Sequence, residues 1–401
     1  MAESDRPGAL DGVFVLDLSR ILAGPTCTQL LGDLGATVIK VENPRTGGDD
    51  TRGWGPNYAR DASGAKTDLS AYFMCANRNK MSIGVDISTP EGQETIHRLA
   101  ARADIVIENY KPGGLAKYGL DHATLLAAHP GLVYCSISGF GQTGPNREKP
   151  GYDLMAQGYG GIMSLTGAAD GPPMKVGVGI ADVMCGMYAT IGILAALRHR
   201  DATGEGQHVD LSLVDTQMAW LINEGMNYLV SGKIPDRQGN AHPNIVPYSA
   251  FACADGHVLV AVGNDSQFAR FCDAIGLPAL VTDARFVTNQ GRIENRAGLM
   301  EHLEPALASL TRADVIARLE AVGVPVGPIN DVAEALGSDQ AKARGAVVEV
   351  PVQGMQEGVL RLLGNPLKLS RTPVSYRRPP PRFGQDGEAV LALLAEPAEK
   401  P

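Results

Sequence analysis

The chain has 401 residues, of which 44% are hydrophobic and 20% charged, a composition typical of a globular protein and not of a disordered one. The formal net charge is −9, from 35 basic and 44 acidic residues, and no basic tract occurs, which argues against nucleic acid or an anionic membrane as the main partner. The six cysteines form no C-x-x-C pair and the histidines have no metal-binding spacing, so we expect no metal site and a reducing, cytoplasmic location.

Neither the N-terminal segment nor the most apolar run of the sequence suggests export or membrane insertion. The polar, acidic Met1–Asp5 does not have the pattern of a signal or transit peptide. The most apolar run, Ile180–Leu197, contains Asp182 and several small residues. We therefore expect it to be a buried helix and not a membrane span.

Strands and helices alternate through the first half of the chain. Strands are predicted at 13–16, 38–41, 82–85, 105–107, 132–134 and 208–211. Helices are predicted at 25–34, 89–103, 154–165, 181–200 and 214–229, where Pro25 and Thr89-Pro90-Glu91 fit helix starts and Gly35 fits a helix end. This alternation predicts an α/β fold in which helices cover both faces of a parallel sheet.

The second half has a different pattern. Residues 231–247 are rich in Gly, Pro, Asn and Asp, which is typical of a linker or an active-site loop. Residues 248–262 alternate as strands around a turn at Asp255-Gly256, and helical stretches run on to about residue 345. We interpret this part as a second, smaller domain, followed from residue 346 by a tail with strands and a proline-rich segment, 378–381.

Asp182 is the clearest chemical anomaly, since it is the only charged side chain between Val176 and Leu197. Burying a carboxylate costs several kcal/mol unless it is paired or hydrogen-bonded. It is either the N-cap of a helix or a functional carboxylate. The two are compatible, because a helix N-terminus keeps a carboxylate ionised and therefore nucleophilic.

Two further segments are candidates for a ligand pocket. Lys149–Asp153 offers Tyr152 and Asp153 as polar lining, although Asp153 fits a helix cap equally well. The first strand–helix turn, Ser19–Pro25, lacks G-x-G-x-x-G, which argues against NAD or FAD, and no P-loop occurs. The backbone at Ala23–Gly24 can still receive a phosphate at a helix start.

Ordered motifs along nearly the whole chain resemble the class III CoA-transferases, the family of formyl-CoA transferase, carnitine CoA-transferase and α-methylacyl-CoA racemase. The motifs are Leu22–Pro25, Asp33–Glu42, Asn77–Lys80, Val106–Gly113, Ser138–Gly141, Thr203–Gln207, Gly323–Pro328 and Pro366–Ser370. The resemblance implies a Rossmann-like large domain with a parallel sheet, a smaller α+β domain, and ring-shaped subunits in an interlocked homodimer. It implies these boundaries: 1–212 for the large CoA-binding domain, 213–247 for a linker helix and active-site loop, 248–345 for the small domain, and 346–401 for a linker and the C-terminal return to the large domain.

The resemblance also implies site residues. The nucleophilic aspartate of the family falls on Asp182. The positions implied for coenzyme A are Leu22, Ala23, Asn43, Val85, Asp86, Asn109, Tyr110, Lys111, Lys117, Gly151, Tyr152 and Asp153. Family members often carry Arg where this chain has Asn43, and the nearest base here is Arg45, so the phosphate contacts in this region differ from the family pattern.

The family holds two chemistries, and position 152 separates them. The racemase resembles an acid/base catalyst with a histidine at this position, whereas this chain has Tyr152. Tyrosine, with an ordinary pKa of about 10, is a poor general base at neutral pH. We therefore expect a CoA-transferase that moves CoA from an acyl-CoA, such as succinyl-CoA, to a free carboxylic acid through an aspartyl anhydride and an aspartyl-CoA thioester, with no tightly bound cofactor.

The overall sequence pattern, including Gly171–Gly177 ahead of Asp182 and Asn240–Pro243 with Pro247-Tyr248, most resembles the succinyl-CoA:dicarboxylate branch of the family. His242, Lys175 and Arg52 are candidate cations for the distal carboxylate of such an acceptor. Gly239–Pro243 is a candidate source of oxyanion-stabilising N–H groups, or a simple linker. Oxalate or formyl exchange, carnitine transfer, racemisation, and CoA-ester binding without turnover remain alternatives.

Overall fold

The computed structural model describes residues 7–395, so the polar segment Met1–Asp5 lies outside the described residues. The chain divides into two compact units. The first comprises Met1–Ile162, Lys175–Val230 and Asp339–Pro401, and the second comprises Met163–Met174 and Ser231–Ser338. The predicted boundaries run differently around residues 163–174 and 339–345, and they stay a prediction about functional domains.

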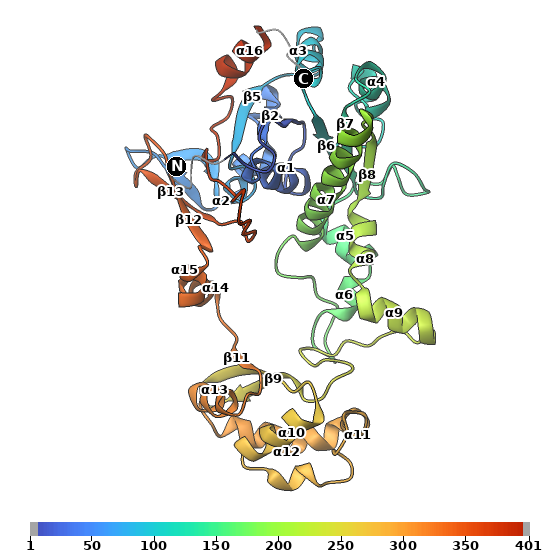
Figure 1. Ribbon diagram of the computed structural model, residues 1–401, viewed down its shortest axis with the longest axis vertical. Coiled ribbons are helices and arrows are strands. Elements are labelled where there is room, and N and C mark those ends of the chain that lie inside the picture. The colour runs from blue at the N-terminus through green and yellow to red at the C-terminus, as the bar shows by residue number, and fades with distance from the viewer. Residues whose placement is uncertain (1–6, 396–401) are drawn as a thin grey trace. The chain divides into compact units, whose positions relative to one another are not determined.

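A six-stranded parallel sheet forms the centre of the first unit (Figure 1). Its order is β5-β2-β1-β6-β7-β8. The strands are β1 (Phe14–Asp17), β2 (Thr37–Glu42), β5 (Lys80–Gly84), β6 (Ile105–Glu108), β7 (Val133–Ser138) and β8 (His208–Ser212). Each neighbouring pair is parallel. The predicted α/β class is confirmed, and every predicted strand of the first half takes its place in this sheet.

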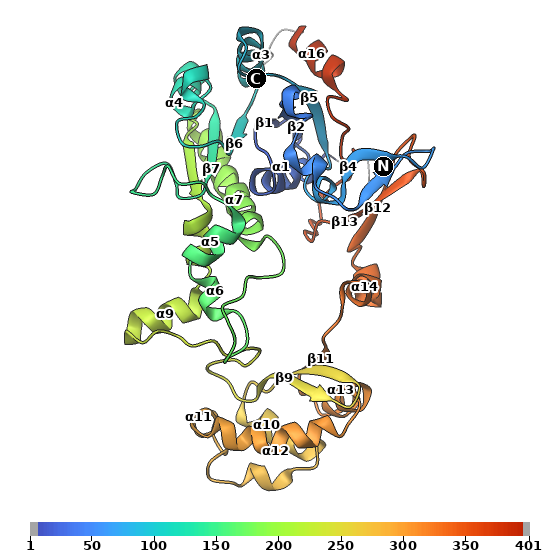
Figure 2. The same ribbon diagram turned by 180° about the vertical axis from the view of Figure 1, so that it is seen from behind.

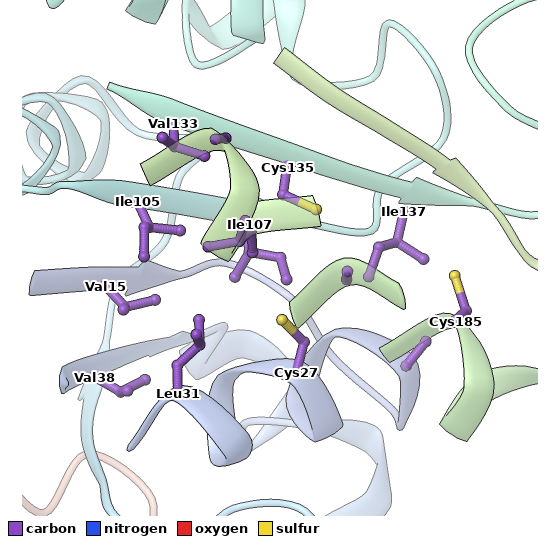
Figure 3. Close-up of a cluster of buried hydrophobic side chains, with 14 of the residues drawn as sticks. Val15, Cys27, Leu31, Val38, Ile105, Ile107, Val133, Cys135, Ile137 and Cys185 are labelled. Carbon is purple, nitrogen blue, oxygen red and sulfur yellow. The ribbon is translucent and has the colours of Figure 1, made fainter. Parts of the chain in front are cut away.

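Helices cover both faces of the sheet, as its apolar strands require. One face packs on α1 (Ala23–Asp33) and α7 (Ile180–Thr203), and Figure 3 shows Cys27 of α1, Cys135 of β7 and Cys185 of α7 among the valines and isoleucines of that core. The other face packs on α3 (Pro90–Ala100), α4 (His122–Ala128) and α16 (Gly387–Ala395). Figure 2 shows α16, at the end of the described chain, beside α3.

The helix α7 corresponds to the predicted buried helix, and about half of it is buried. Its length and hydropathy would suffice to cross a membrane. It packs instead against α1, β7 and β8, with Ala181, Cys185, Ala189 and Ile193 fully buried. Gly186 permits close approach, because a Cβ there would lie 2.6 Å from the carbonyl oxygen of Ala23 on α1.

Two predicted helices are wrong in their continuity. The predicted helix 154–165 is α5 (Asp153–Tyr159) and α6 (Ile162–Leu165), interrupted where Gly161 has φ +91°. The predicted helix 214–229 is α8 (Leu213–Ala219) and α9 (Ile222–Ser231), and Ile222, the first residue of α9, has φ +36°. The apolar spacing predicted the helical segments but not the local backbone reversals that separate them.

Residues between β2 and β5 pack with the C-terminal tail. This region contains the short helices η2 (Pro44–Thr46), η3 (Asp50–Gly53) and α2 (Ala71–Met74) and the hairpin β3 (Tyr58–Arg60) and β4 (Lys66–Ser70). The tail contributes α15 (Asp339–Ala343) and the antiparallel pair β12 (Val347–Pro351) and β13 (Val359–Leu363). Leu69 and Phe73 share a small core with Val350 and Leu360, which joins segments almost 300 residues apart. The remaining short helix of this unit is η4 (Ala116–Tyr118).

The second unit is a small α+β structure with its own core. Its antiparallel sheet has the order β11-β10-β9, from β9 (Tyr248–Cys253), β10 (Gly256–Ala261) and β11 (Val326–Pro328). The predicted turn at Asp255-Gly256 joins the first two strands. Its helices are α10 (Asp265–Ala274), η5 (Pro278–Val281), α11 (Asn289–Glu294), α12 (Arg296–Ala308), α13 (Arg312–Ala321) and α14 (Val332–Gly337).

Candidate active site

A cleft of about 650 Å³ opens at the carboxyl ends of the parallel strands of the first unit. Its walls come from the segments that follow β1, β2, β5, β6 and β7, together with Lys149–Tyr152, Asp182 and Leu213. In open parallel sheets, ligands bind outside this edge, because the loops of several strands converge there. The volume is sufficient for a large small-molecule ligand.

All but one of the predicted site residues line this cleft. They are Leu22, Ala23, Asn43, Val85, Asp86, Asn109, Tyr110, Lys111, Lys117, Gly151, Tyr152 and Asp182. The exception is Asp153, which does not line the cleft and instead contacts the backbone of α7. The fold therefore brings together residues from six separate segments of the sequence.

Asp182 lies at the third position of α7 and is half-buried in the cleft wall. The interpretation of Asp182 as an N-cap is wrong, because the N-cap residue is Gly179 and no side chain caps this helix from within. Burial, and then the negative charge of Asp153, raise the pKa of the Asp182 carboxyl to about 7. The expectation was that the helix terminus keeps this carboxylate ionised. With a pKa of about 7, part of the population is instead protonated at neutral pH.

Asp153 supplies the cap that α7 lacks. Its Oδ1 accepts hydrogen bonds from the backbone N–H groups of Ala181 at 2.8 Å and Asp182 at 3.3 Å, and its Oδ2 accepts one from Gln157 Nε2 at 2.6 Å. The alternative in which Asp153 caps its own helix is wrong, because the N-cap of α5 is Tyr152 and makes no capping bond. Asp153 thus fixes the first turn of α7, and with it the position of Asp182.

Two glycines bring the segment before α5 to the sheet edge. A Cβ on Gly151 would lie 2.1 Å from the Cα of Gly139, and a Cβ on Gly139 would lie 2.4 Å from the Cα of Gly151. Only glycine at both positions permits this backbone contact. The contact places Tyr152 and Asp153 beside the end of β7.

Basic side chains predominate among the charged residues of the cleft: Arg20, Arg45, Lys111, Lys117 and Lys149 against Glu42, Asp86 and Asp182. Arg20 pairs with Asp50 at 2.9 Å and Arg45 with Asp86 at 2.5 Å. The three lysines form no ion pair with residues 7–395. A cleft with this charge excess favours an anionic ligand.

Three of these cations, Arg20, Arg45 and Lys149, were not among the predicted site residues, although Arg45 was noted as the nearest base to Asn43. Each stands next to predicted site residues, so sequence neighbourhood was the available signal. Two side chains predicted to contact CoA, those of Asn43 and Asn109, form hydrogen bonds with the protein backbone. The Asn43 side chain accepts a bond from the backbone of Arg45, and the Asn109 amide exchanges two bonds with the backbone of Arg20, at 2.9 and 2.7 Å.

The three candidate cations for a distal carboxylate differ in availability. Arg52 is buried and bound to Glu42 and Asp68, so it is not free to bind a substrate. Lys175 donates to the carbonyl oxygen of Val176 at 3.1 Å. His242 and the loop Gly239–Pro243 belong to the second unit, and their role toward Asp182 stays a prediction. Within residues 7–395, no group of His, Cys, Asp or Glu has the arrangement of a metal site.

The fold and the cleft define an α/β protein with a basic cleft at the edge of its parallel sheet and a half-buried carboxylate, Asp182, in the cleft wall. Comparison with known proteins names the class, since the sequence profile of "CoA-transferase family III" matches residues 10–387. The succinate–glutarate CoA-transferase of Agrobacterium fabrum is 46% identical over 390 residues, covering 97% of this chain and 96% of its own length. The succinyl-CoA:mesaconate CoA-transferase of Haloarcula hispanica is 38% identical over 369 residues, covering 91% of each chain.

A solved structure agrees with this assignment. The crystal structure of a CaiB/BaiF family protein from Brucella suis matches with a TM-score of 0.86 and 47% identity, covering 97% of this chain and 100% of that one. The chain therefore belongs to CoA-transferase family III. It is a CoA-transferase, and CoA thioesters are its substrates.

Replacing Asp182 by Asn should stabilise the fold, and more so at higher pH. The carboxyl has an ordinary pKa of 3.8 when unfolded and about 7 when folded. Between these values the folded state holds a proton that the unfolded state has lost, so the stability of the unmodified protein falls as pH rises from about 4 to 7. The neutral amide has no such dependence.

Thermal melting at several pH values measures this effect. We expect Asp182→Asn to melt above the unmodified protein at pH 8, and the difference to shrink steadily toward pH 4. Asp170→Asn, at an exposed position, is the control for replacing one aspartate by asparagine. A constant or inverted difference for Asp182→Asn would mean that the Asp182 pKa is not raised.

Proposed function

We propose that this enzyme transfers CoA from succinyl-CoA, or a similar acyl-CoA, to a dicarboxylic acid, with Asp182 as the covalent nucleophile. The observation that carries the proposal is the Asp182 carboxylate itself. It lies in the wall of a basic cleft, and no side chain of residues 7–395 neutralises it by an ion pair. The relatives support the substrate class, because their names include glutarate, mesaconate and D-citramalate as acceptors of CoA from succinyl-CoA.

The first half of the reaction loads CoA onto the enzyme. An Oδ of Asp182 attacks the thioester carbonyl of the donor, the C–S bond breaks, and its electron pair leaves with the CoA thiolate. The product on the enzyme is a mixed anhydride. The thiolate then attacks Cγ of Asp182, the C–O bond breaks, and the donor leaves as a free carboxylate, so that an aspartyl-CoA thioester remains.

The second half reverses these steps with the acceptor. Its carboxylate attacks Cγ of Asp182 and releases the thiolate, and the thiolate then attacks the acyl carbonyl of the new anhydride. This step forms the acceptor CoA thioester and returns Asp182 as a carboxylate. No proton or electron is gained or lost in the sum, so the proposal invokes no metal or tightly bound cofactor.

The positioning of the reacting groups must supply much of the rate enhancement, because a carboxylate is a weak nucleophile. Holding reacting groups in the right geometry can contribute roughly 7–11 kcal/mol. Several residues lining the cleft supply such a frame: Lys111, Lys117 and Lys149 for the phosphates of CoA, and Leu22 and Ala23 beside the start of α7. Burial of Asp182 also removes water that would hydrolyse the anhydride and the thioester.

We also propose that the enzyme is an interlocked homodimer located in the cytoplasm. None of the residues Ile222–Ser231 of α9 is buried. This helix exposes Ile222, Met226, Tyr228, Leu229 and Val230, and α7 exposes Met187, Tyr188 and Ile191. Apolar surface of this extent marks a protein–protein interface, and a second copy of the chain would cover it.

Transfer is tested by mixing the purified enzyme with succinyl-CoA and a panel of free acids, and by reading new CoA thioesters by mass spectrometry. We expect thioesters of C4 to C6 dicarboxylates, a peptide containing Asp182 that carries CoA when donor is present alone, and loss of both in Asp182→Ala. Asp170→Ala should keep full activity. Oxalate or carnitine as the only acceptor would change the substrate class, and loss of optical purity in a 2-methylacyl-CoA would favour the racemase.

The pH dependence of the reaction tests the partner of Asp182. Because the carboxylate must be ionised to attack, kcat/KM for the acyl-CoA should rise about tenfold per pH unit below pH 7 and level off above it. Asp153→Asn keeps a hydrogen-bond acceptor but removes the like charge, so the rising limb should move to lower pH. An unmoved limb would show that Asp153 does not raise the pKa of Asp182.

Dimerisation is measured by sedimentation at several protein concentrations. The unmodified enzyme should sediment as a dimer throughout. Leu229→Lys and Val230→Lys place charge on the exposed face of α9 and should shift the enzyme toward monomer or insoluble chain. A monomer without any substitution would contradict the proposal.

A further inference from the structure

The turn between β1 and α1 contains a backbone conformation that its residue disfavours. Ile21 has φ +71°. The left-handed region is uncommon for any residue with a Cβ, and a β-branched residue there is a genuine outlier. Such conformations persist only where the surroundings hold them, and they concentrate at binding and catalytic sites.

A buried acid–base pair holds this residue. Both carboxylate oxygens of Asp49 lie 3.3 Å from the backbone N of Ile21 and accept its N–H. Lys40 Nζ lies 2.9 Å from Asp49 Oδ2 and also donates to the carbonyl oxygen of Ser19 at 3.0 Å. The side chains of Lys40 and Asp49 are fully buried. The pair therefore binds the turn at the carbonyl oxygen of Ser19 and at the N–H of Ile21.

Other bonds fix the pair and the turn. Asp49 accepts from the N–H and hydroxyl of Thr51, and its own N–H donates to Glu42. Burial alone would raise the pKa of Asp49, but the charge of Lys40 and the hydrogen bonds from Lys40 and Thr51 lower it to about 2, so the carboxylate is ionised at neutral pH. The turn is also compact, since a Cβ on Gly24 would lie 2.3 Å from Cβ of Ser19.

The residues that follow Ile21 form the cleft wall nearest the nucleophile helix. Leu22 is the N-cap residue of α1 and has no side-chain cap. A Cβ on Gly179, three residues before Asp182, would lie 3.1 Å from Leu22 Cδ2. The carbonyl oxygen of Ala23 stands close to Gly186 of α7. The backbone conformation of Ile21 therefore determines the position of Leu22 and Ala23 relative to α7.

We propose that Asp49, held by Lys40, is a positioning residue for the acyl-CoA cleft: it keeps Ile21 in the left-handed conformation that places Leu22 and Ala23 against the helix of Asp182. The proposal rests on the function proposed above, because it takes the cleft to hold CoA. It assigns Asp49 a role that involves no contact with the substrate.

A double-mutant cycle with free CoA as the probe tests the role. The dissociation constant for CoA is measured by calorimetry for the unmodified enzyme, Asp49→Ala, Ile21→Gly, and the double variant. We expect Asp49→Ala to weaken binding at least tenfold. In the Ile21→Gly background the same change should weaken binding less than threefold, because glycine adopts a positive φ without support.

A matched control comes from the β3–β4 hairpin. Asp61 also accepts backbone N–H bonds, from Ser63 and Ala65, but does not line the cleft. Asp61→Ala should leave CoA binding unchanged. Equal weakening by Asp49→Ala in both backgrounds would overturn the positioning role, and so would no weakening in either. If the unmodified enzyme itself fails to bind CoA, the proposed function falls, and the positioning role falls with it.

A second measurement does not require Asp49→Ala to fold. Ile21→Gly and Ile21→Ala both remove the side chain beyond Cβ, and only alanine keeps the atom that disfavours positive φ. At an ordinary site the glycine variant is the less stable of the two. Here we expect it to melt about 2 °C above the alanine variant. An alanine variant that melts at or above the glycine variant would show that Ile21 is not held against strain.

Discussion

The close packing of α1 against α7 is the constraint on which the site depends. The two helices lie on the same face of the sheet, and Gly186 lets the backbone of one approach the first turn of the other. A larger residue at that position would force the helices apart. Because Leu22 and Ala23 begin one helix and Asp182 lies in the first turn of the other, the distance between the helices also sets the width of the cleft at Asp182.

Asp182 shows how a fold changes the acidity of the proposed nucleophile. Burial and the charge of Asp153 raise the pKa of Asp182 to about 7. A raised pKa makes the carboxylate more nucleophilic when ionised, and it leaves part of the population protonated at neutral pH. Asp153 has two effects on Asp182: it caps the helix that carries Asp182, and its negative charge repels the Asp182 carboxylate. The raised pKa of Asp182 lowers the folding stability at neutral pH, and such a loss of stability is characteristic of active sites.

A network of buried charges supports the loops at the same sheet edge. Lys40, Asp49, Glu42 and Arg52 lie with almost no solvent exposure and bond to one another or to the backbone of neighbouring turns. Such pairs add little net stability in comparison with apolar packing, because desolvation offsets their attraction. They do fix direction, since a misplaced turn would leave a buried charge without a partner.

The sequence by itself determined the α/β class, the six strands of the sheet and the candidate nucleophile. The spacing of apolar residues and the local composition indicate the secondary structure, because short apolar strands and amphipathic helices each have a characteristic side-chain spacing. Asp182 was visible because a charge within an apolar helix is costly wherever the helix lies. The sequence did not determine the breaks at Gly161 and Ile222, the role of Asp153 as the cap of a distant helix, or the burial of Arg52.

These features were decided only by the tertiary structure, because each depends on a contact between segments far apart in the chain. Asp153 and Ala181 are 28 residues apart, and nothing in either segment identifies the other as its partner. The pKa of Asp182 depends on desolvation, which is a property of the assembled cleft. The same holds for Ile21, whose backbone conformation is fixed by a carboxylate from a loop that the local sequence pattern left unassigned.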